Sequence, residues 1–184
     1  MTRGLLAASL VPPLVLAGCV APVAVTPPPV AIAPEQRTLQ QEIAATPGLS
    51  AFAAGLAASG DRRAAADTPV TVFAADDGAY ARLAPGVAEA LLAPENRDVL
   101  QRFVGYHLVA GRIDVAELRR LVAAGGGRAA LPTLAGEALT LTLTGNVPTL
   151  TDADGDVAYV TGDEVVRPNG VLHVVNGVLS PTLP

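Results

Sequence analysis

The spacing of apolar residues predicts helices in the first part of the folded region. Apolar side chains recur three and four residues apart from Leu39 onward, which places them on one face of a helix. A short β-rich segment at residues 71–74 interrupts the helices, and Asp114 with Glu117 three residues later matches a capping box. The predicted helices cover residues 39–43, 49–56, 83–92, 99–104 and 115–122.

The apolar period changes from helical to alternating after the glycines at residues 125–127. Leucine and threonine alternate over residues 139–144, which is the pattern of a half-buried strand. Shorter strands are predicted at residues 149–151 and 157–160, on either side of a hairpin turn at Asp154-Gly155.

The last stretch, residues 169–181, is apolar in both alternation phases. It predicts a strand buried on both faces and entered through a turn at Asn169-Gly170. Helices first and strands later favour an α+β fold, in which N-terminal helices pack on a β-sheet region and the C-terminal strand is buried. We expect one domain over residues 38–184, a size that can bury a core without disulfides.

The start of the chain has the pattern of an export signal. Arg3 supplies a positive charge, and residues 4–17 form an apolar run that is short for a transmembrane helix and suits a signal peptide. The residues Leu16-Ala17-Gly18-Cys19 resemble the lipobox of bacterial lipoproteins, in which the cysteine is acylated and becomes the first residue. The alternative is an ordinary secretory signal in which Cys19 is incidental.

The lipoprotein resemblance implies a signal peptide over residues 1–18 and a lipidated Cys19. A Pro-rich linker then runs through residue 37, and such segments act as semi-rigid spacers. Lipidation implies attachment to the membrane of a bacterial cell envelope. Val20 stands where an Asp could follow the cysteine, which by resemblance favours the outer membrane in a cell that has two, with the side of display left open.

The charge pattern argues against nucleic acid as a partner. The chain has a formal net charge of -5, and its 12 basic residues are scattered arginines with no lysine among them. Nucleic-acid binding needs a clustered basic surface, which this pattern does not predict.

Few residues could carry catalysis. His107 and His173 are the only histidines, and each stands between apolar neighbours, where a neutral ring bonded to a backbone group or a carboxylate is usual. No serine after Cys19 lies in a Gly-x-Ser-x-Gly elbow, and the single cysteine is assigned to the lipid. We therefore expect a protein that is not an enzyme and needs no cofactor.

Clustered carboxylates at residues 152–156 raise the question of a calcium site. An EF-hand loop beginning at Asp152 would need Gly at its sixth position and Glu at its twelfth, whereas the chain has Val157 and Asp163 there. A hairpin turn solvated by its own carboxylates is the preferred interpretation. We predict no metal site, and whether this loop binds any ion stays open.

Three segments, in order, resemble the fasciclin (FAS1) family. They are TVFAADDGAY at 71–80, Tyr106-His107 within GYHLVAGRI, and NGVLHVVNGVLSP at 169–181, with LLAPENRDVLQRFVGYH as the family's usual lead-in to the second. The chain departs from the pattern at Ala75 and Asp76, where Pro and Thr are common, and at Tyr80, where Phe is common. The resemblance implies framework roles for Thr71, Val72, Phe73, Tyr106, His107, Asn169, Gly170 and His173.

The resemblance implies a non-catalytic adhesion or interaction module. With the anchor and linker, we expect a lipid-anchored module of the cell envelope that contacts proteins or matrix polymers. The alternative is a binding module for a small apolar ligand or lipid in the periplasm, which would need a cavity of several hundred cubic ångströms. An enzyme is a third hypothesis, and it requires that His107 or His173 be exposed beside a carboxylate.

Overall fold

The computed structural model describes residues 33–182, which belong to one compact unit. The predicted signal peptide, Cys19 and most of the predicted linker lie outside the described residues. The end of the predicted linker contains a short 3-10 helix, η1 (Pro34–Gln36), and the first α-helix follows at Leu39.

The helices begin and end where the local sequence provides caps. Thr38 and Gln41 form a reciprocal capping box at the start of α1, and Gly60, in a left-handed conformation, ends α2. The helix predicted from residue 83 begins only at Val87, because Pro85 and the left-handed Gly86 come first. The helical elements are α1 (Leu39–Ala45), α2 (Ser50–Ser59), α3 (Asp77–Tyr80), α4 (Val87–Leu92), η2 (Pro94–Asn96), α5 (Arg97–Tyr106) and α6 (Val115–Ala124).

The strands form one sheet of seven in the order β2-β1-β7-β6-β5-β4-β3. Its neighbours are antiparallel except for β1 and β7, which run parallel. An isolated bridge between Val109 and Thr133 joins the two edges, so the sheet curls nearly into a barrel. The strands are β1 (Val70–Ala75), β2 (Leu108–Ala110), β3 (Ala129–Pro132), β4 (Ala138–Thr144), β5 (Val147–Thr151), β6 (Val157–Arg167) and β7 (Gly170–Val175).

The sheet contains more β structure than the apolar pattern predicts. The short strands β2 and β3 were not expected, and β6 runs seven residues beyond its predicted end, from Val160 to Arg167, through an irregularity between Thr161 and Val165. The turn into β7 also differs from the prediction. Its two residues are Pro168 and Asn169, and Gly170 already belongs to the strand.

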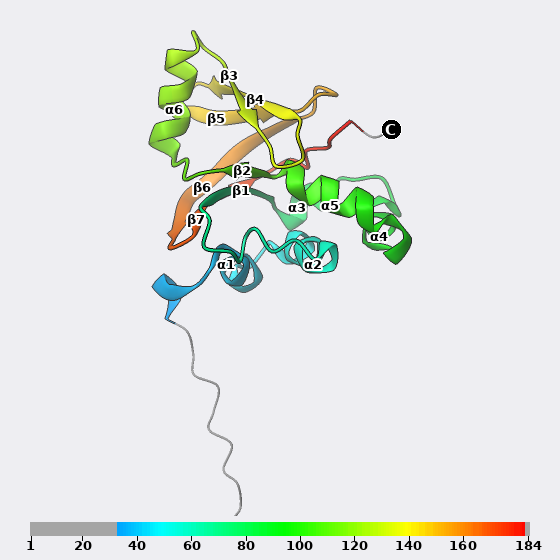
Figure 1. Cartoon of the computed structure of the whole chain (residues 1–184). Coiled ribbons are helices and arrows are strands. Elements are labelled where there is room, and N and C mark those ends of the chain that lie inside the picture. Colours follow the sequence, from blue (N-terminus) through cyan, green and yellow to red (C-terminus); the bar gives the residue numbers. More distant parts are fainter. Residues whose placement is uncertain (1–32, 183–184) are drawn as a thin grey trace, which may run out of the picture. The chain divides into compact units, whose positions relative to one another are not determined.

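β1 separates two apolar cores. Its Val72 and Ala74 pack with buried residues of α1, α2 and α5, whereas Phe73 and Ala75 pack with buried residues of β3–β6 and α6. In Figure 1 the helices α1 and α2 accordingly lie below β1 and β7, and α6 lies beside the strands β3–β5. β7 is buried along nearly its whole length, in agreement with the sequence prediction.

Gly170 allows β7 to enter between α1 and β1. Its φ of 148° lies in a region that L side chains rarely adopt. A Cβ atom at this position would overlap the carbonyl oxygen of Val70 and lie 2.8 Å from Cδ1 of Leu39. The close approach of the first long strand, the last strand and the first helix therefore requires glycine here.

Replacing Gly170 with alanine should force β1 and β7 apart. We expect Gly170→Ala to lower the free energy of unfolding by at least about 3 kcal/mol, because backbone and core side chains must both move. Gly86→Ala is the matched control, since Gly86 also has a positive φ, 85°, but nothing within 4 Å of the added Cβ. It should cost only about 1 kcal/mol. Equal losses in denaturant titrations of the two variants would contradict the close-approach argument.

Candidate functional site

The residues that carry the family resemblance meet around β1 and β7. The parallel register places Thr71 beside Val171, Val72 beside Leu172, and Phe73 beside His173. The Thr71 hydroxyl donates to the carbonyl oxygen of Gly111 at 2.8 Å and accepts from the amide of Ile113 at 2.9 Å. This buried hydroxyl fixes the segment that leads from β2 to α6.

His173 also holds this segment. Its Nε2 donates to the carbonyl oxygen of Ile113 at 2.7 Å, and its ring stacks on Phe73 with 5.3 Å between centroids and 17° between planes. Burial lowers the pKa of His173, and the carboxylates of Glu164 and Asp114 only partly oppose this. The ring is therefore neutral at pH 7, with its proton on Nε2.

His107 is enclosed between aromatic rings. Its Nδ1 donates to the carbonyl oxygen of Phe103 at 3.0 Å, and its ring lies 4.7 Å from that of Phe103 and 5.4 Å from that of Phe52. Its side chain is fully buried, and burial lowers its pKa from 6.5 to about 4. Neither histidine is exposed. The enzyme hypothesis requires a histidine that is exposed beside a carboxylate, and this condition is not met.

Tyr106, the last residue of α5, is buried near the Asp152 carboxylate of the turn between β5 and β6. Burial, with help from the Asp152 carboxylate, raises the pKa of the Tyr106 phenol. The Asp152 side chain is only 7% exposed and accepts from the amides of Asp154 at 3.1 Å, Asp156 at 2.8 Å and Ser180 at 3.0 Å. The prediction of a solvated turn is therefore wrong for Asp152, whose carboxylate is committed to backbone amides.

Metal-binding potential is low in the part of the chain that the structure describes. Within residues 33–182, no three His, Cys, Asp or Glu side chains are grouped so that they could hold a metal ion. The Asp152 carboxylate already accepts from backbone amides of its own turn and of Ser180, which explains why this run of aspartates does not form a cage.

Asn169 joins three parts of the chain. Its side-chain oxygen accepts from the amide of Leu39 at 2.9 Å, and its side-chain nitrogen donates to the carbonyl oxygens of Ala64 at 2.8 Å and Ala66 at 3.0 Å. The residue is 3% exposed, so these bonds satisfy polar groups that would otherwise be buried without partners. Asn169 thus fastens α1 and the loop before β1 to the start of β7.

Asp76 and Asp77 each cap a helix, and the role of Asp77 could not be predicted from the sequence. Asp76 caps α3 through the amide of Ala79 at 2.6 Å. Asp77 accepts from the amide of Ala51 at 2.8 Å and the hydroxyl of Ser50 at 2.7 Å, and these bonds hold its pKa below the usual range. In sequence the pair indicates a turn or a helix start, and the start of α3 agrees with the second interpretation. Only the fold shows that Asp77 also caps α2, 26 residues away.

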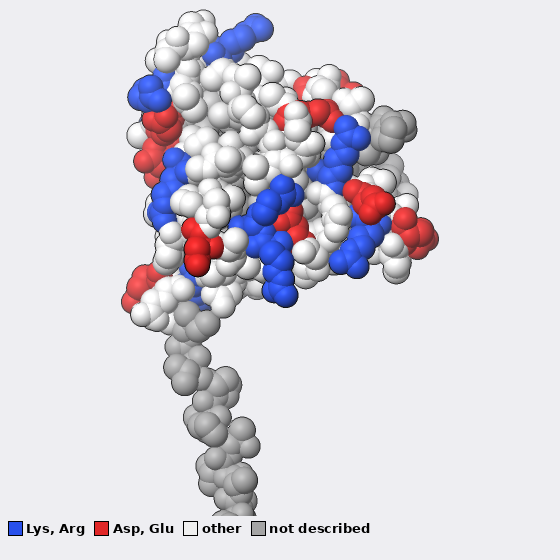
Figure 2. All heavy atoms as spheres, viewed as in Figure 1, with Lys and Arg blue, Asp and Glu red and all other residues white. Residues whose placement is uncertain are grey.

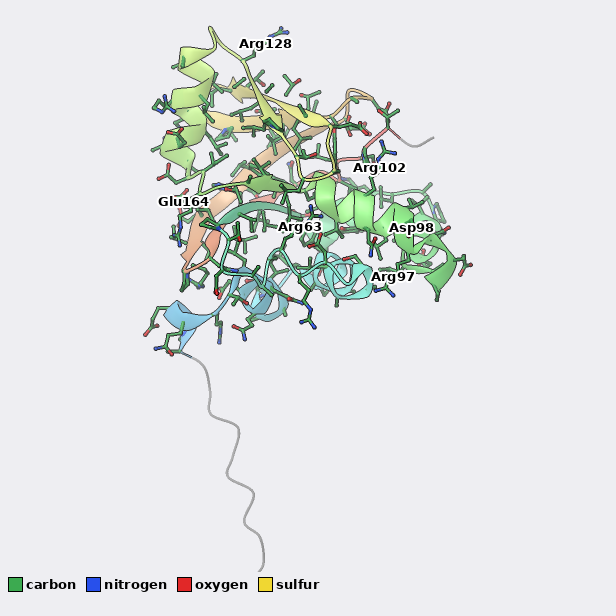
Figure 3. All side chains as sticks on the ribbon, in the orientation of Figure 1. Arg63, Arg97, Asp98, Arg102, Arg128 and Glu164 are labelled. Carbon is green, nitrogen blue, oxygen red and sulfur yellow. The ribbon has the colours of Figure 1, made fainter. Side chains whose placement is uncertain are left out.

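Two arginines, Arg63 in the loop after α2 and Arg102 on α5, serve the fold. Arg63 pairs with Asp61 and donates to the carbonyl oxygen of Leu134 at 3.0 Å. Arg102 pairs with Glu137 at 2.5 Å. Figure 3 shows both extending from neighbouring segments on the side of the domain that faces the viewer. These charges are engaged with groups of the same chain, so they give little basis for a charged docking patch.

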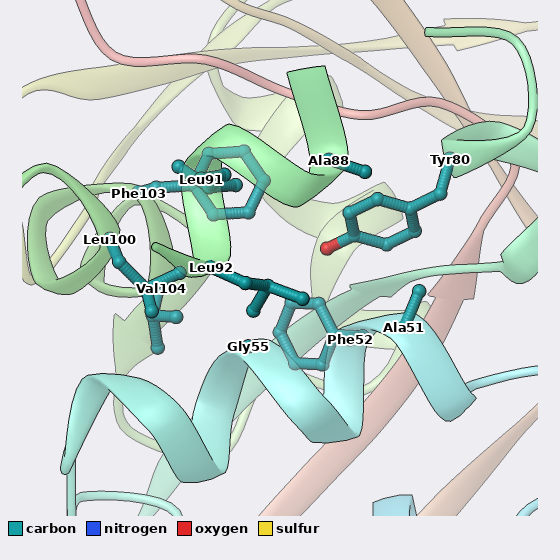
Figure 4. A pocket seen from close by; sticks show the side chains of 10 residues that line it. All are labelled: Ala51, Phe52, Gly55, Tyr80, Ala88, Leu91, Leu92, Leu100, Phe103 and Val104. Carbon is teal, nitrogen blue, oxygen red and sulfur yellow. The ribbon is translucent and has the colours of Figure 1, made fainter. Parts of the chain in front are cut away.

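An enclosed apolar pocket lies between α2, α4 and α5 (Figure 4). Tyr80 points its hydroxyl into this pocket, and burial raises its pKa. The cavity measures about 30 Å³, close to the volume of one water, whereas sites for small ligands occupy several hundred. The pocket therefore gives no support to the hypothesis of a small apolar ligand.

A wider and more open groove of about 650 Å³ runs beside the start of α6. Its charged side chains are already engaged. Arg120 pairs with Glu117 at 2.5 Å, Asp114 caps α6, and Arg112 donates to the carbonyl oxygen of Pro168. This groove is consequently a weak candidate for a site that recognises a charged ligand.

The curled sheet, the helices packed against it and the buried histidines define an α+β domain. The structure is similar to a FAS1 domain pair from the insect cell adhesion molecule Fasciclin I, with a TM-score of 0.66 at 17% sequence identity. That match covers 80% of this chain and 51% of the insect chain, and at this identity it shows the fold alone.

Sequence comparison gives the family. The family model described as Fasciclin domain matches residues 47–181, and the chain therefore belongs to the fasciclin family, with a single such domain. Domains of this family are generally non-catalytic adhesion domains.

Two proteins of the cyanobacterium Synechocystis sp. are similar to this chain. Protein sll1483 is 38% identical over 122 residues, which cover 64% of this chain and 58% of that protein. Protein sll1735 is 30% identical over 111 residues, which cover 60% of this chain and 72% of that protein. The chain thus spans little more than half the length of sll1483.

Among residues 33–182, no helix is long and apolar enough to cross a bilayer.

Acid should destabilise the domain through His107. Its pKa is 6.5 in an unfolded chain and about 4 in the folded one, so the unfolded state takes up the proton first as the pH falls. The free energy of unfolding should be highest above pH 6.5 and decrease by roughly 3 kcal/mol on the way to pH 4, below which this residue causes no further loss. Denaturant titrations across this range measure the effect.

The variant His107→Met separates this residue from other titrating groups, because methionine fills a similar space and carries no proton. Its stability should depend less on pH between 6.5 and 4 than that of the wild type, with His173 supplying part of the remaining slope in the same direction. A slope equal to that of the wild type would show that His107 does not control the acid response.

Proposed function

We propose that this protein is a lipid-anchored interaction module of the bacterial cell envelope, which contacts proteins or matrix polymers without catalysis. The observation that carries the proposal is the order of parts in one chain. A signal-like apolar run ends at a lipobox-like Cys19, a Pro-rich segment follows, and a fasciclin domain comes next. Each part has a physical role in display at a surface.

The anchor and the spacer address different requirements of display. Acyl chains hold a protein at a membrane by burying methylene groups, each worth about 0.8 kcal/mol, and more than one chain is needed for lasting attachment. Pro-rich segments favour extended conformations. Such a segment between Cys19 and the domain would keep the domain clear of the bilayer and leave its surface accessible to partners.

The buried framework supports the non-catalytic part of the proposal. His107 and His173 are both neutral and inaccessible, and the Asp152 carboxylate is saturated with backbone amides. These three side chains are thereby committed to the fold. The surface of the domain is left as the part available for function, which is the expected arrangement for an adhesion module.

Cys19→Ala tests the anchor. The chain has one cysteine, so incorporation of an alkyne-labelled palmitate reports on that position alone. We expect the wild type to be labelled and to fractionate with membranes, and the variant to lose both properties. In a host with two membranes, Val20→Asp is the matched control and should keep the label while shifting toward the inner-membrane fraction. Labelling and membrane association that both survive Cys19→Ala would refute the anchor.

Capture from envelope and surface fractions tests the interaction function. The Cys19→Ala protein, immobilised through a C-terminal tag, should retain a protein or polysaccharide that is absent from eluates of the Gly170→Ala variant, whose fold we expect to be disturbed. The readouts are mass spectrometry for proteins and carbohydrate analysis for polymers. Identical eluates from the two baits would count against an interaction module.

A further inference from the structure

The outer face of β4, β5 and β6 carries an ordered set of hydroxyl groups. In the antiparallel register Thr140 lies beside Thr151, which lies beside Val157, and in the next row Thr142 lies beside Thr149, which lies beside Tyr159. The alternate residues on these strands, such as Leu141, Leu150 and Ala158, are fully buried in the interior core. The threonines and Tyr159 therefore share the opposite face of the sheet.

Most of this face is exposed and its rows are uncharged, although Thr149, at the centre of the second row, is only 4% exposed. Tyr159 is 38% exposed, Val157 45% and Val147 40%. Apart from the Tyr159 phenol, no ionisable side chain occupies the positions of these rows, and Thr144 and Val147 continue the pattern in the following row. On the side of the domain shown in Figure 2, charged side chains are gathered over α2, α5 and α6 and are sparse over β3 and β4.

The hydroxyl groups on this face are held by the backbone. Threonines two residues apart on a strand are about 6.6 Å apart, and those on neighbouring strands about 4.8 Å. Thr149 also donates its hydroxyl to that of Thr144 at 2.9 Å. A β-branched side chain on a hydrogen-bonded strand has few conformations to lose on binding, so this surface is preorganised.

An open pocket of about 220 Å³ adjoins the face at Val157. Its polar side chains are Arg82, Asp156 and Asn176, from three separate segments. The Asn176 side-chain oxygen accepts from the amide of Tyr159 at 2.9 Å, which orients its amide group, and Arg82 donates to the Asn176 carbonyl oxygen. The described residues give the Asp156 carboxylate no hydrogen-bond donor, so it can accept from a ligand.

We propose that this face and its pocket bind a neutral polysaccharide, with Tyr159 stacking on a sugar ring. A pyranose presents an apolar C–H face that fits an aromatic ring, and hydroxyl groups that pair with hydroxyls, carboxylates and amides. The rows carry no charged side chain, which disfavours acidic polymers. Their hydroxyl groups lie among the exposed apolar side chains of Val147, Val157 and Tyr159, a mixture that suits the surface of a sugar better than a bilayer. The inference rests on the function proposed above, of which it names the partner.

Affinity electrophoresis of the full chain, purified in detergent, tests this inference. The gels contain hydroxyethyl cellulose, dextran or a soluble xylan as neutral probes, or alginate as an acidic one. We expect at least one neutral polymer to retard the wild type more than alginate does. Tyr159→Ala should weaken binding about tenfold or more, as loss of a central aromatic contact does, while Tyr159→Phe should stay within about threefold. Asp156→Ala should also weaken binding.

Val166→Ala is the matched control, because Val166 is an exposed apolar residue, 51% accessible, on the same strand but outside the rows described. It should bind as the wild type does, and unchanged melting temperatures show that the variants are folded. Absence of retardation by every neutral polymer, stronger retardation by alginate, or equal affinity for Tyr159→Ala would each overturn the inference.

The two proposals can fail separately. If the Tyr159→Ala bait captured the same envelope components as the wild-type surface while no neutral polymer bound, a partner of another class would be in use and only this inference would fall. If neither the capture experiment nor the gels gave a partner, both would fall.

Discussion

The parallel pairing of β1 with β7 is the constraint on which the rest of the domain depends. Val70 lies beside Gly170, so strands a hundred residues apart in the sequence must meet before either core is complete. One face of the pair carries the helices, and the other faces the interior of the curled sheet. Because such a pairing is non-local, its loop-closure entropy must be offset by contacts that form together, which favours cooperative folding.

The polar residues of the family motifs are the means by which this pairing is made specific. Asn169 and Thr71 satisfy buried backbone groups on neighbouring segments, and His173 bonds to the carbonyl of the segment that Thr71 holds. In each histidine one ring nitrogen is buried without a hydrogen-bond partner among the described residues, and this lowers the stability of the folded state. Stacking on Phe73 and enclosure by Phe52 and Phe103 offset part of it. Residues that look reactive in the sequence are therefore structural.

The apolar pattern of the sequence correctly predicted the helices and strands that are long enough to show a regular period. The stripes around Phe52 and Phe103 gave α2 and α5, and the Leu-Thr alternation gave β4, because these elements bury one face at a regular period. β2 and β3 were not predicted because each is a short edge strand of three or four residues, too short to show an apolar period of its own. The role of Asp152 was not predicted either, because Ser180, the third residue whose amide donates to its carboxylate, is brought near only by the fold.

The residues of the family motifs are buried and hydrogen-bonded within the fold. Recognition of a partner must therefore use surface side chains that the fold does not require. The threonines and Tyr159 on the outer face of β4–β6 are of this kind, because the strands would pair equally well with other β-formers there. A single shallow site of this type gives modest affinity on its own. Under the proposed anchoring, many copies would share one membrane and meet a repetitive polymer together. Linked binding events of that sort raise the overall strength by orders of magnitude without a deeper pocket. A small solid domain with an open, preorganised face is thus physically sufficient for attachment, although it would be a poor design for a soluble receptor of small ligands.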